Sequence, residues 1–155
     1  MVTKTRHTGI VVSDMDQALK FYRDLLGISK VVLDRIGGDS YYDRVVGLKG
    51  THLRVVMLEL DDGTRIELLQ YLSHPRSAPA RVESCDIGCS HIALEVADVG
   101  ALCEKLTEAG LAMNCPPLVD ARGYAKVSYV HDYDGTIVEL VQILDDTQVP
   151  YREGS

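Results

Sequence analysis

The chain has 155 residues, of which 46% are hydrophobic and 25% charged, so it can form a buried core, and neither a disordered nor a fibrous protein is expected. Its 16 Lys and Arg residues stand against 23 Asp and Glu, and a net charge of −7 without a basic cluster argues against nucleic-acid binding. No apolar run reaches the roughly 18 residues of a membrane span, and the N-terminus lacks the pattern of a signal peptide. We therefore expect a cytoplasmic protein that keeps its four cysteines reduced.

The chain contains an internal repeat, because two of its stretches recur in the same order. The sequence HTGIVVSD at 7–14 is similar to HIALEVAD at 91–98, at an offset of 84 residues. The sequence DDGTRIELLQYL at 61–72 is similar to YDGTIVELVQIL at 133–144, with seven identical positions of twelve and an offset of 72 residues. Two copies of one module are therefore predicted, and the 12 extra residues of the first copy fall near 35–52.

In chain order, the first copy predicts a strand, a helix and three more strands. The strand at 7–12 is rich in β-branched residues, and the helix over 15–26 carries apolar residues at helical spacing. Asp14 is placed to cap the start of this helix, and Gly27 to end it, because glycine adopts the left-handed conformation at the least cost. The three further strands are expected at 29–35, 53–60 and 65–72.

The second copy repeats this order of elements. A strand is expected at 91–96 and a helix over 99–109, which begins after Asp98 and ends at Gly110. Three further strands are expected at 112–118, 125–131 and 136–144. The predicted fold class is α+β, with two tandem βαβββ modules. One domain over 1–155 is expected, with module one at 5–72, a linker at 73–87, module two at 88–145 and a tail at 146–155.

Four chemistry-bearing residues recur at equivalent places in the two copies. His7 and His91 open the first strands, whereas Glu67 and Glu139 lie in the last strands and interrupt apolar runs, where an unpaired charge is costly. Two imidazoles and two carboxylates form a mixed N/O set that suits a divalent first-row metal. Four such ligands around an octahedral ion would leave positions for water or substrate. For any one of these residues alone, an ordinary place on a strand is the alternative.

The stretches around these residues resemble the vicinal oxygen chelate superfamily, which includes glyoxalase I, methylmalonyl-CoA epimerase, extradiol dioxygenases and the fosfomycin- and bleomycin-resistance proteins. The resemblance extends over 5–144 and rests on the motifs HTGIVVSDMDQALKFYRDLLG, IELLQYL, SHIALEVADVGALCEKLTEAG and YVHDYDGTIVELVQ. It implies that the paired modules form a half-open barrel around one metal site. By the same resemblance, the metal-ligand positions fall on His7, Glu67, His91 and Glu139.

The complete set of four ligands makes the chain more similar to the glyoxalase and epimerase branch than to the extradiol dioxygenases. The string IELLQYL and His131 in YVHDYDG look most like methylmalonyl-CoA epimerases. Those epimerases carry a further acidic residue just before the third strand, but this chain has no carboxylate between Asp43 and Glu59. His52 or a metal-bound glutamate is the alternative for that role.

The resemblance implies a metal-dependent isomerase or lyase that acts on a small oxygenated substrate through a metal-stabilised enolate. Glu139 and Glu67 are the candidate catalytic bases, because they are the only acidic residues duplicated at the expected site. The metal, whether Co, Ni, Mn, Zn or Fe, stays open. A non-haem Fe(II) dioxygenase and a non-catalytic small-molecule binding or resistance protein are the alternative functions. A homodimer is also implied by the resemblance.

The insertion in the first copy is the expected source of substrate specificity, because long loops in compact domains tend to be functional. Its polar and aromatic side chains would line a pocket for an anionic oxygenated substrate, and a solvated loop or a dimer contact is the alternative for each. Residues before and at the end of the penultimate strand are candidates for the same role. The predicted substrate-binding residues are Tyr42, Arg44, His52, Arg54, Arg122 and His131.

Overall fold

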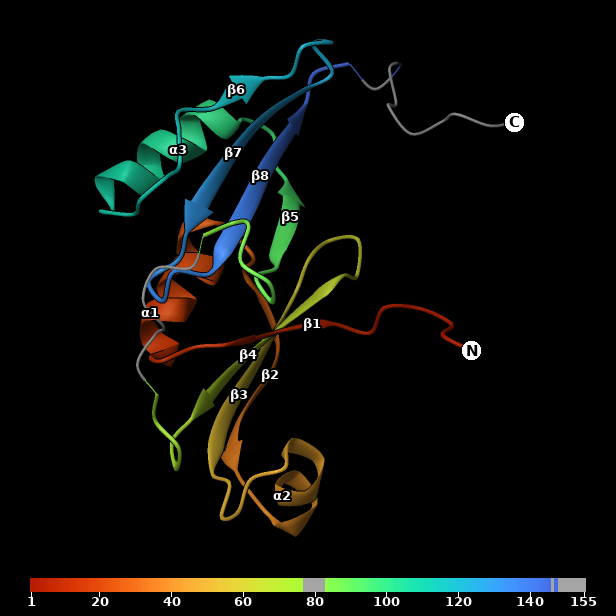
Figure 1. Ribbon diagram of the computed structural model, residues 1–155, viewed down its shortest axis with the longest axis vertical. Helices are drawn as coiled ribbons and strands as arrows, with labels where there is room; N and C mark the ends of the chain where they lie inside the picture. Colours follow the sequence, from red (N-terminus) through yellow and green to blue (C-terminus); the bar gives the residue numbers. More distant parts are fainter. Residues whose placement is uncertain (77–82, 146, 148–155) are drawn as a thin grey trace. The chain divides into compact units, whose positions relative to one another are not determined.

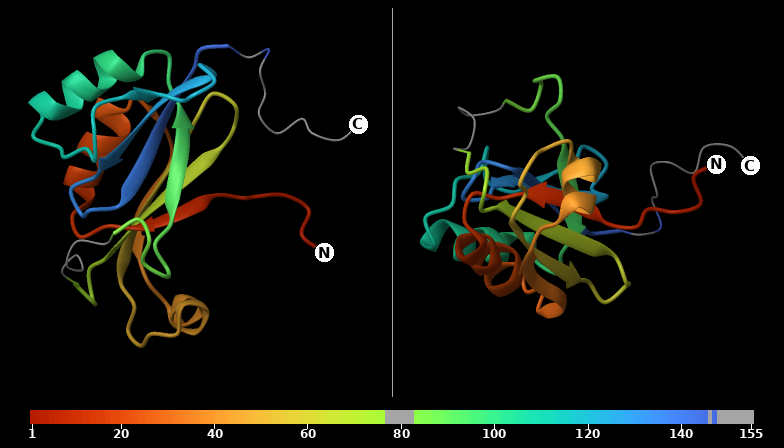
Figure 2. Two further views of the ribbon diagram at one scale, coloured as in Figure 1. Left: turned by 45° about the horizontal axis from the view of Figure 1, so that its top comes forward. Right: turned by 90° about the horizontal axis from the view of Figure 1, so that it is seen from below.

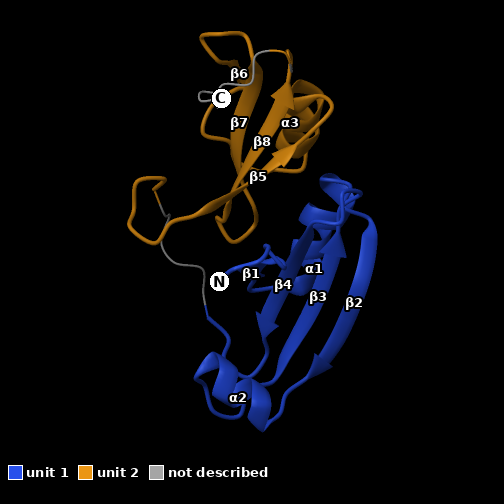
Figure 3. Ribbon diagram, turned by 90° about the vertical axis from the view of Figure 1, so that its right-hand side faces the viewer, with its two compact units in different colours: residues 1–80 blue, residues 81–155 orange. Residues whose placement is uncertain are grey.

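The computed structural model describes residues 1–76, 83–145 and 147 (Figure 1). It divides the chain into two compact units, residues 1–80 and 81–155, which are coloured separately in Figure 3. The boundary falls inside the predicted linker, whereas the predicted tail lies almost wholly outside the described residues. No helix in the described part of the chain has both the length and the apolar character of a membrane span.

Unit 1 is a four-stranded sheet with a helix packed on one face. The strand order is β1-β4-β3-β2, in which β1 runs parallel to β4 and the other neighbours are antiparallel. The π-helix η1 follows α1 directly, and the strands β3 and β4 form a hairpin. The elements are β1 (Thr8–Val11), α1 (Met15–Leu19), η1 (Lys20–Leu25), β2 (Lys30–Gly37), α2 (Ser40–Val46), β3 (Leu53–Glu59) and β4 (Arg65–Tyr71).

Unit 2 has the same topology, with strand order β5-β8-β7-β6 and the first strand parallel to the last. Its helix α3 lies against β7 and β8 (Figure 2). The predicted duplication of βαβββ modules and the α+β class are therefore confirmed. The elements are β5 (His91–Glu95), α3 (Val99–Glu108), β6 (Leu118–Val119), β7 (Ala125–His131) and β8 (Ile137–Ile143).

A repeated glutamine joins the helix to the sheet in each unit. Gln70 Oε1 accepts a hydrogen bond of 3.3 Å from the backbone amide of Met15, at the start of α1. Gln142 Oε1 accepts one of 3.1 Å from the amide of Val99, at the start of α3. The first helical amides have no partner within their own helix, so an acceptor from the last strand satisfies one of them. This contact explains why glutamine is identical in the two copies.

The helix starts and stops follow the sequence pattern. The carboxylates of Asp14 and Asp98 cap α1 and α3, accepting backbone amides of Gln17 at 2.9 Å and of Ala101 at 3.1 Å. The glycines expected to end the helices, Gly27 and Gly110, have positive φ angles of 84° and 82°.

The core of each unit lies between its helix and the sheet face that the helix covers. Its fully buried side chains include Phe21, Tyr22, Ile66, Leu68, Val99, Leu106, Val138 and Leu140.

The first predicted helix is not one continuous α-helix. Five residues of α1 lead into six residues of π-helix, where the amide of Leu26 donates to the carbonyl of Phe21, five residues earlier, at 2.9 Å. Phe21 and Tyr22 are both fully buried, and their rings meet edge to face with centroids 4.8 Å apart. The apolar pattern of the sequence predicts a helix but does not distinguish these two hydrogen-bond spacings.

The strand predicted at 112–118 is wrong for most of its length. The only strand residues are Leu118 and Val119, which pair with β7, whereas Met113 forms an isolated bridge with Val130, flanked by backbone hydrogen bonds of Ala112 and Asn114 to β7. Pro116 and Pro117 explain the difference, because proline has no backbone N–H to donate to a ladder.

The inserted region of the first copy contains the short helix α2, which the sequence analysis treated as a loop. Asp39 caps this helix through the amides of Tyr41 and Tyr42. The carboxylate of Asp43 then closes the following turn by accepting the amides of Gly50 at 2.8 Å and Thr51 at 2.7 Å. These backbone hydrogen bonds lower the pKa of Asp43, because they stabilise its charged form.

Candidate functional site

The first candidate half-site lies on unit 1 and consists of His7 and Glu67. His7 directly precedes β1, and the parallel pairing of β1 with β4 places Gly9 beside Glu67. Residues two apart on a strand share a face, so both side chains lie on the same face of the sheet. His7 Nε2 is 3.3 Å from Glu67 Oε2, and the two side chains are 35% and 20% exposed. The carboxylate is thus partly buried but open to a ligand.

The second half-site repeats this arrangement on unit 2. His91 begins β5, and the parallel pairing of β5 with β8 places Ala93 beside Glu139. His91 Nε2 is 3.1 Å from Glu139 Oε2, with side-chain exposures of 45% and 21%. The four residues predicted as metal ligands therefore form two equivalent histidine–glutamate pairs, one in each unit.

Each half-site offers one imidazole nitrogen and one carboxylate oxygen, a donor set that suits divalent Zn, Co, Ni, Mn or Fe. Within residues 1–76, 83–145 and 147, no group of three or more His, Cys, Asp or Glu side chains is assembled to hold an ion. A single half-site thus offers two potential protein ligands.

Tyr129 is a residue of the second half-site that the sequence analysis missed. It lies opposite Glu139 in the antiparallel pairing of β7 with β8, and its hydroxyl is 3.3 Å from His91 Nε2. The two rings are 5.1 Å apart between centroids. Burial raises the pKa of Tyr129, and the neighbouring Glu139 raises it further. The repeat could have revealed this position. The two copies are equally spaced around their Asp-Gly turns, so Tyr129 corresponds to Met57, the residue opposite Glu67 in the first copy.

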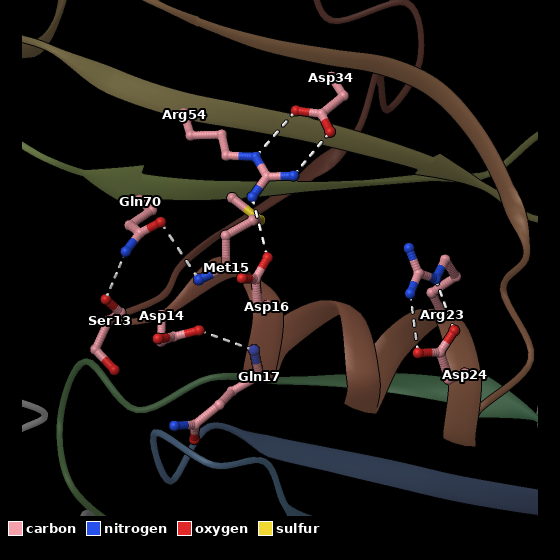
Figure 4. Close-up of polar contacts among 10 residues, drawn as sticks. All are labelled: Ser13, Asp14, Met15, Asp16, Gln17, Arg23, Asp24, Asp34, Arg54 and Gln70. Atoms are coloured by element: carbon pink, nitrogen blue, oxygen red, sulfur yellow. Dashed lines mark hydrogen bonds and ion pairs between the residues drawn. The ribbon is translucent and has the colours of Figure 1, made fainter.

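Arg54, predicted to bind substrate, lies on the opposite face of the unit 1 sheet from Glu67. It is paired with Gln70 across β3 and β4, on the face that α1 covers. Figure 4 shows its guanidinium bridging two carboxylates: Nε and Nη2 donate to Asp34 at 3.1 and 2.9 Å, and Nη1 donates to Asp16 at 3.2 Å. These contacts lower the pKa of Asp34 and raise that of Arg54. Arg54 thus connects β3 to β2 and α1.

Arg54→Met is expected to lower the free energy of unfolding by about 1 kcal/mol at pH 7, since it removes a bidentate ion pair. The pKa of Asp34 is lower in the folded protein than the value of about 3.9 expected in the unfolded chain. Its ion pair therefore stabilises the fold above that unfolded pKa, and the stabilisation is lost as the pH falls through the folded-state pKa. The urea midpoint of wild type should therefore fall more steeply than that of Arg54→Met between pH 5 and about pH 2. Arg23→Met, which breaks an exposed pair with Asp24, is the control and should change the midpoint little. Parallel pH profiles for wild type and Arg54→Met would contradict this role.

His131, the last residue of β7, lies on the same face as Tyr129 because the two are two residues apart. Its Nε2 is 2.8 Å from Asn114 Oδ1, and its Nδ1 is 3.3 Å from the carbonyl oxygen of Gly135. The structure therefore brings His131 and Tyr129 to the face that carries Glu139.

The other predicted substrate residues lie away from the half-site of their own unit. Tyr42 and Arg44 are on α2, and His52 follows it, at the end of the sheet where Leu53 pairs with Tyr71. That row is four residues along β4 from Glu67, or about 13 Å at 3.3 Å per residue. The Tyr42 ring packs instead beneath the Arg35 guanidinium, 5.2 Å from its centroid. The backbone amide of Arg122 donates to Asp120 in the turn before β7.

Two cavities adjoin these elements. His7 lines one of about 370 Å³ in unit 1, between the N-terminal segment and the turn that joins β3 to β4. Another, of about 840 Å³, lies in unit 2 between α3 and residues 111–117, and Lys126 lines it. Lys126 is paired with Gln142, on the helix-covered face of the sheet, so this cavity and Glu139 lie on opposite faces. The basic residues that border the smaller cavity are Lys4, Arg6 and Arg65.

Known proteins share this sequence pattern and fold. A family model for the Glyoxalase/Bleomycin resistance protein/Dioxygenase superfamily matches residues 6–129. A probable lactoylglutathione lyase of Synechocystis is 28% identical over 139 residues, which are 88% of this chain and 92% of that protein. An ethylmalonyl-CoA/methylmalonyl-CoA epimerase of Cereibacter sphaeroides is 29% identical over 148 residues, or 92% of this chain and 100% of that protein.

A solved structure supports the same fold. The crystal structure of a glyoxalase family protein from Bacillus cereus matches 94% of this chain and 97% of its own, with a TM-score of 0.84 and 22% identity. The family match covers most of the chain, and the fold match extends over both units. The chain belongs to the Glyoxalase/Bleomycin resistance protein/Dioxygenase superfamily.

Proposed function

We propose that this protein is a divalent-metal-dependent isomerase, epimerase or lyase that acts on a small oxygenated substrate. The observation that carries the proposal is the duplicated pair: in each unit an imidazole nitrogen lies within 3.3 Å of a glutamate carboxylate oxygen at an equivalent position. The relatives named as a lactoylglutathione lyase and an ethylmalonyl-CoA/methylmalonyl-CoA epimerase support this choice of reaction class. Lactoylglutathione and methylmalonyl-CoA are therefore the first substrates to assay.

His7, Glu67, His91 and Glu139 would together hold the metal. Their donor atoms are imidazole nitrogens and carboxylate oxygens, which suit a divalent first-row ion, and all four side chains are partly exposed. When bound, such an ion supplies a Lewis acid that stabilises negative charge developing on the substrate oxygens.

Glu67 or Glu139 would transfer the proton. A carboxylate beside the reacting carbon can remove the α-proton as a general base and then return it to the same or a neighbouring atom. Glu67 and Glu139 both qualify, since each is about four-fifths buried and faces an imidazole rather than a Lys or Arg partner. Tyr129 adds a hydroxyl donor beside Glu139, where it can orient a substrate oxygen.

The test of this proposal is the metal content of protein purified without chelator or an affinity-tag metal. Near-stoichiometric Co, Ni, Mn or Zn is expected in wild type, and its loss is expected in Glu67→Ala, because the variant lacks one of the proposed ligands. Glu95→Ala removes an exposed strand glutamate outside both half-sites and is the matched control, which should retain the metal. Iron retained by Glu67→Ala would favour a dioxygenase instead. The absence of metal from every sample would favour a non-catalytic binding protein.

We also propose, from the family resemblance, that the chain forms a homodimer. Light scattering coupled to size exclusion should give about twice the chain mass of 17.1 kDa.

A further inference from the structure

The large cavity of unit 2 has no part in the function proposed above. It has a volume of about 840 Å³ and lies on the helix-covered face of the sheet, opposite to the face of Glu139. Three sulfur-bearing side chains line it: Cys103 from α3, and Met113 and Cys115 from the segment that leads from α3 to β6 (Figure 1). Two free cysteines and a thioether therefore border one cavity.

Ser128 connects the two cysteines. It is a buried residue of β7, and its hydroxyl donates to the carbonyl oxygen of Cys115 at 3.0 Å. The same side chain is hydrogen-bonded to the thiol of Cys103. Met113 is held on β7 as well, through its bridge with Val130. All three sulfur-bearing residues are thus anchored to one strand, and the cavity belongs wholly to unit 2.

The Cys103 thiol is poorly suited to oxidation or to nucleophilic chemistry. It is 4% exposed, and burial raises its pKa, which Ser128 and Lys126 lower and the neighbouring Cys115 raises further. A thiol with a raised pKa carries little thiolate at neutral pH, so it reacts slowly with electrophiles and disulfides. A thiophilic cation can still bind, because it displaces the proton from the sulfur.

The donor set favours a soft cation. Thiolate and thioether sulfur bind Cu(I), whereas Mn, Mg and Ca prefer oxygen ligands. Glu104 and Glu108 also line the cavity, but both are exposed, and no three His, Cys, Asp or Glu side chains are grouped to hold an ion among the described residues. A structural zinc takes four such ligands. Two thiols and a thioether therefore suit a monovalent soft ion of low coordination number better than zinc.

The charges around the cavity are mixed. Lys126 lines it, and its ammonium group and the Asp98 carboxylate both lie near Gly100 at the start of α3. Two thiolates around a monovalent cation leave one net negative charge, which Lys126 offsets. Glu104 and Glu108 act in the opposite direction, but their exposed positions allow water and salt to screen them.

We propose that the thiolates of Cys103 and Cys115 bind a soft monovalent cation of the Cu(I) class, with the thioether of Met113 as a third donor. Binding releases the two thiol protons, and the bound ion joins α3 to residues 111–117. The site is independent of the proposed divalent-metal site, because it consists of different residues and lies on the helix-covered face of the unit 2 sheet.

The test is competition for Cu(I) between the protein and the chelator bathocuproine disulfonate in the absence of oxygen. Wild type should withdraw about one equivalent of Cu(I), and its affinity should rise by up to about 100-fold per pH unit, because two protons are displaced. Cys103→Ala and Cys115→Ala should each weaken binding more than about 100-fold, since even outer-shell partners of a metal contribute 10- to 100-fold. Met113→Leu conserves the apolar volume and should weaken binding less.

The double variant Cys85→Ser, Cys89→Ser is the matched control. Both cysteines lie outside the cavity, so this variant should bind Cu(I) as wild type does. Urea unfolding checks that each variant folds, and Cu(I) should raise the midpoint of wild type but not that of Cys115→Ala, which changes only a partly buried side chain. Loss of all Cu(I) from wild type to the chelator, wild-type affinity in Cys115→Ala, or loss of binding in the double variant would overturn the proposal.

Discussion

Replacing the proposed general base, Glu67 or Glu139, by glutamine should lower kcat about 10²- to 10⁴-fold, the contribution expected of such a base. Glutamine keeps the shape and one oxygen donor of Glu67 or Glu139 but cannot take up a proton. The variant of the residue that acts as the base should therefore lose turnover while still binding metal. The other variant is expected to lose metal affinity first and to recover activity at saturating metal.

The measurement is kcat at saturating metal, together with the uptake of solvent deuterium into the substrate that wild type turns over. Deuterium uptake reports proton removal directly, so it separates a lost base from slow product release. Glu95→Gln, on β5 but outside both pairs, is the control and should behave as wild type. Full turnover by both Glu67→Gln and Glu139→Gln with metal bound would exclude a glutamate base.

Phe21→Ala should lower the free energy of unfolding by about 3–5 kcal/mol, because it removes a large buried ring and leaves a cavity. Phe21 has no exposed surface and packs edge to face on Tyr22, so the loss also includes an aromatic contact. Urea unfolding at pH 7 measures the difference. Tyr41→Ala on α2 is the control, since Tyr41 is 66% exposed, and a change within about 0.5 kcal/mol is expected. Equal losses in the two variants would show that the π-helical segment does not anchor the core.

Much of the fold could be predicted because the signals are local. The carboxylates of Asp14 and Asp98 mark the helix starts, and Gly27 and Gly110 mark their ends, each through contacts or angles within a few residues. Because the module is repeated, each helix and strand is predicted twice, from two different stretches of the sequence. The strand predicted at 112–118 failed where the two copies differ, since Pro116 and Pro117 interrupt a pairing that β2 and β3 make in the first copy.

The candidate site was predicted in part for a different reason. Histidine and glutamate at duplicated positions indicated candidate side chains, but the contact within each pair depends on a parallel pairing of residues 58 positions apart in the first copy and 46 in the second. The role of Arg54 could not be read from its position near the start of a strand, because its partner Asp16 is 38 residues away on α1. Tyr129 was missed because tyrosine is an ordinary strand residue until the register places it against Glu139.

The sequence by itself determined the duplicated βαβββ order, the helix caps and the four residues of the two histidine–glutamate pairs, because each of these is encoded by neighbouring residues or by the repeat. Only the tertiary structure decided which groups surround each glutamate. The register between strands places Met57 opposite Glu67 in one unit and Tyr129 opposite Glu139 in the other, although the two positions are equivalent in the repeat. A one-residue change of register would move every one of these side chains to the opposite face, so long-range pairing rather than composition sets the chemistry of the site.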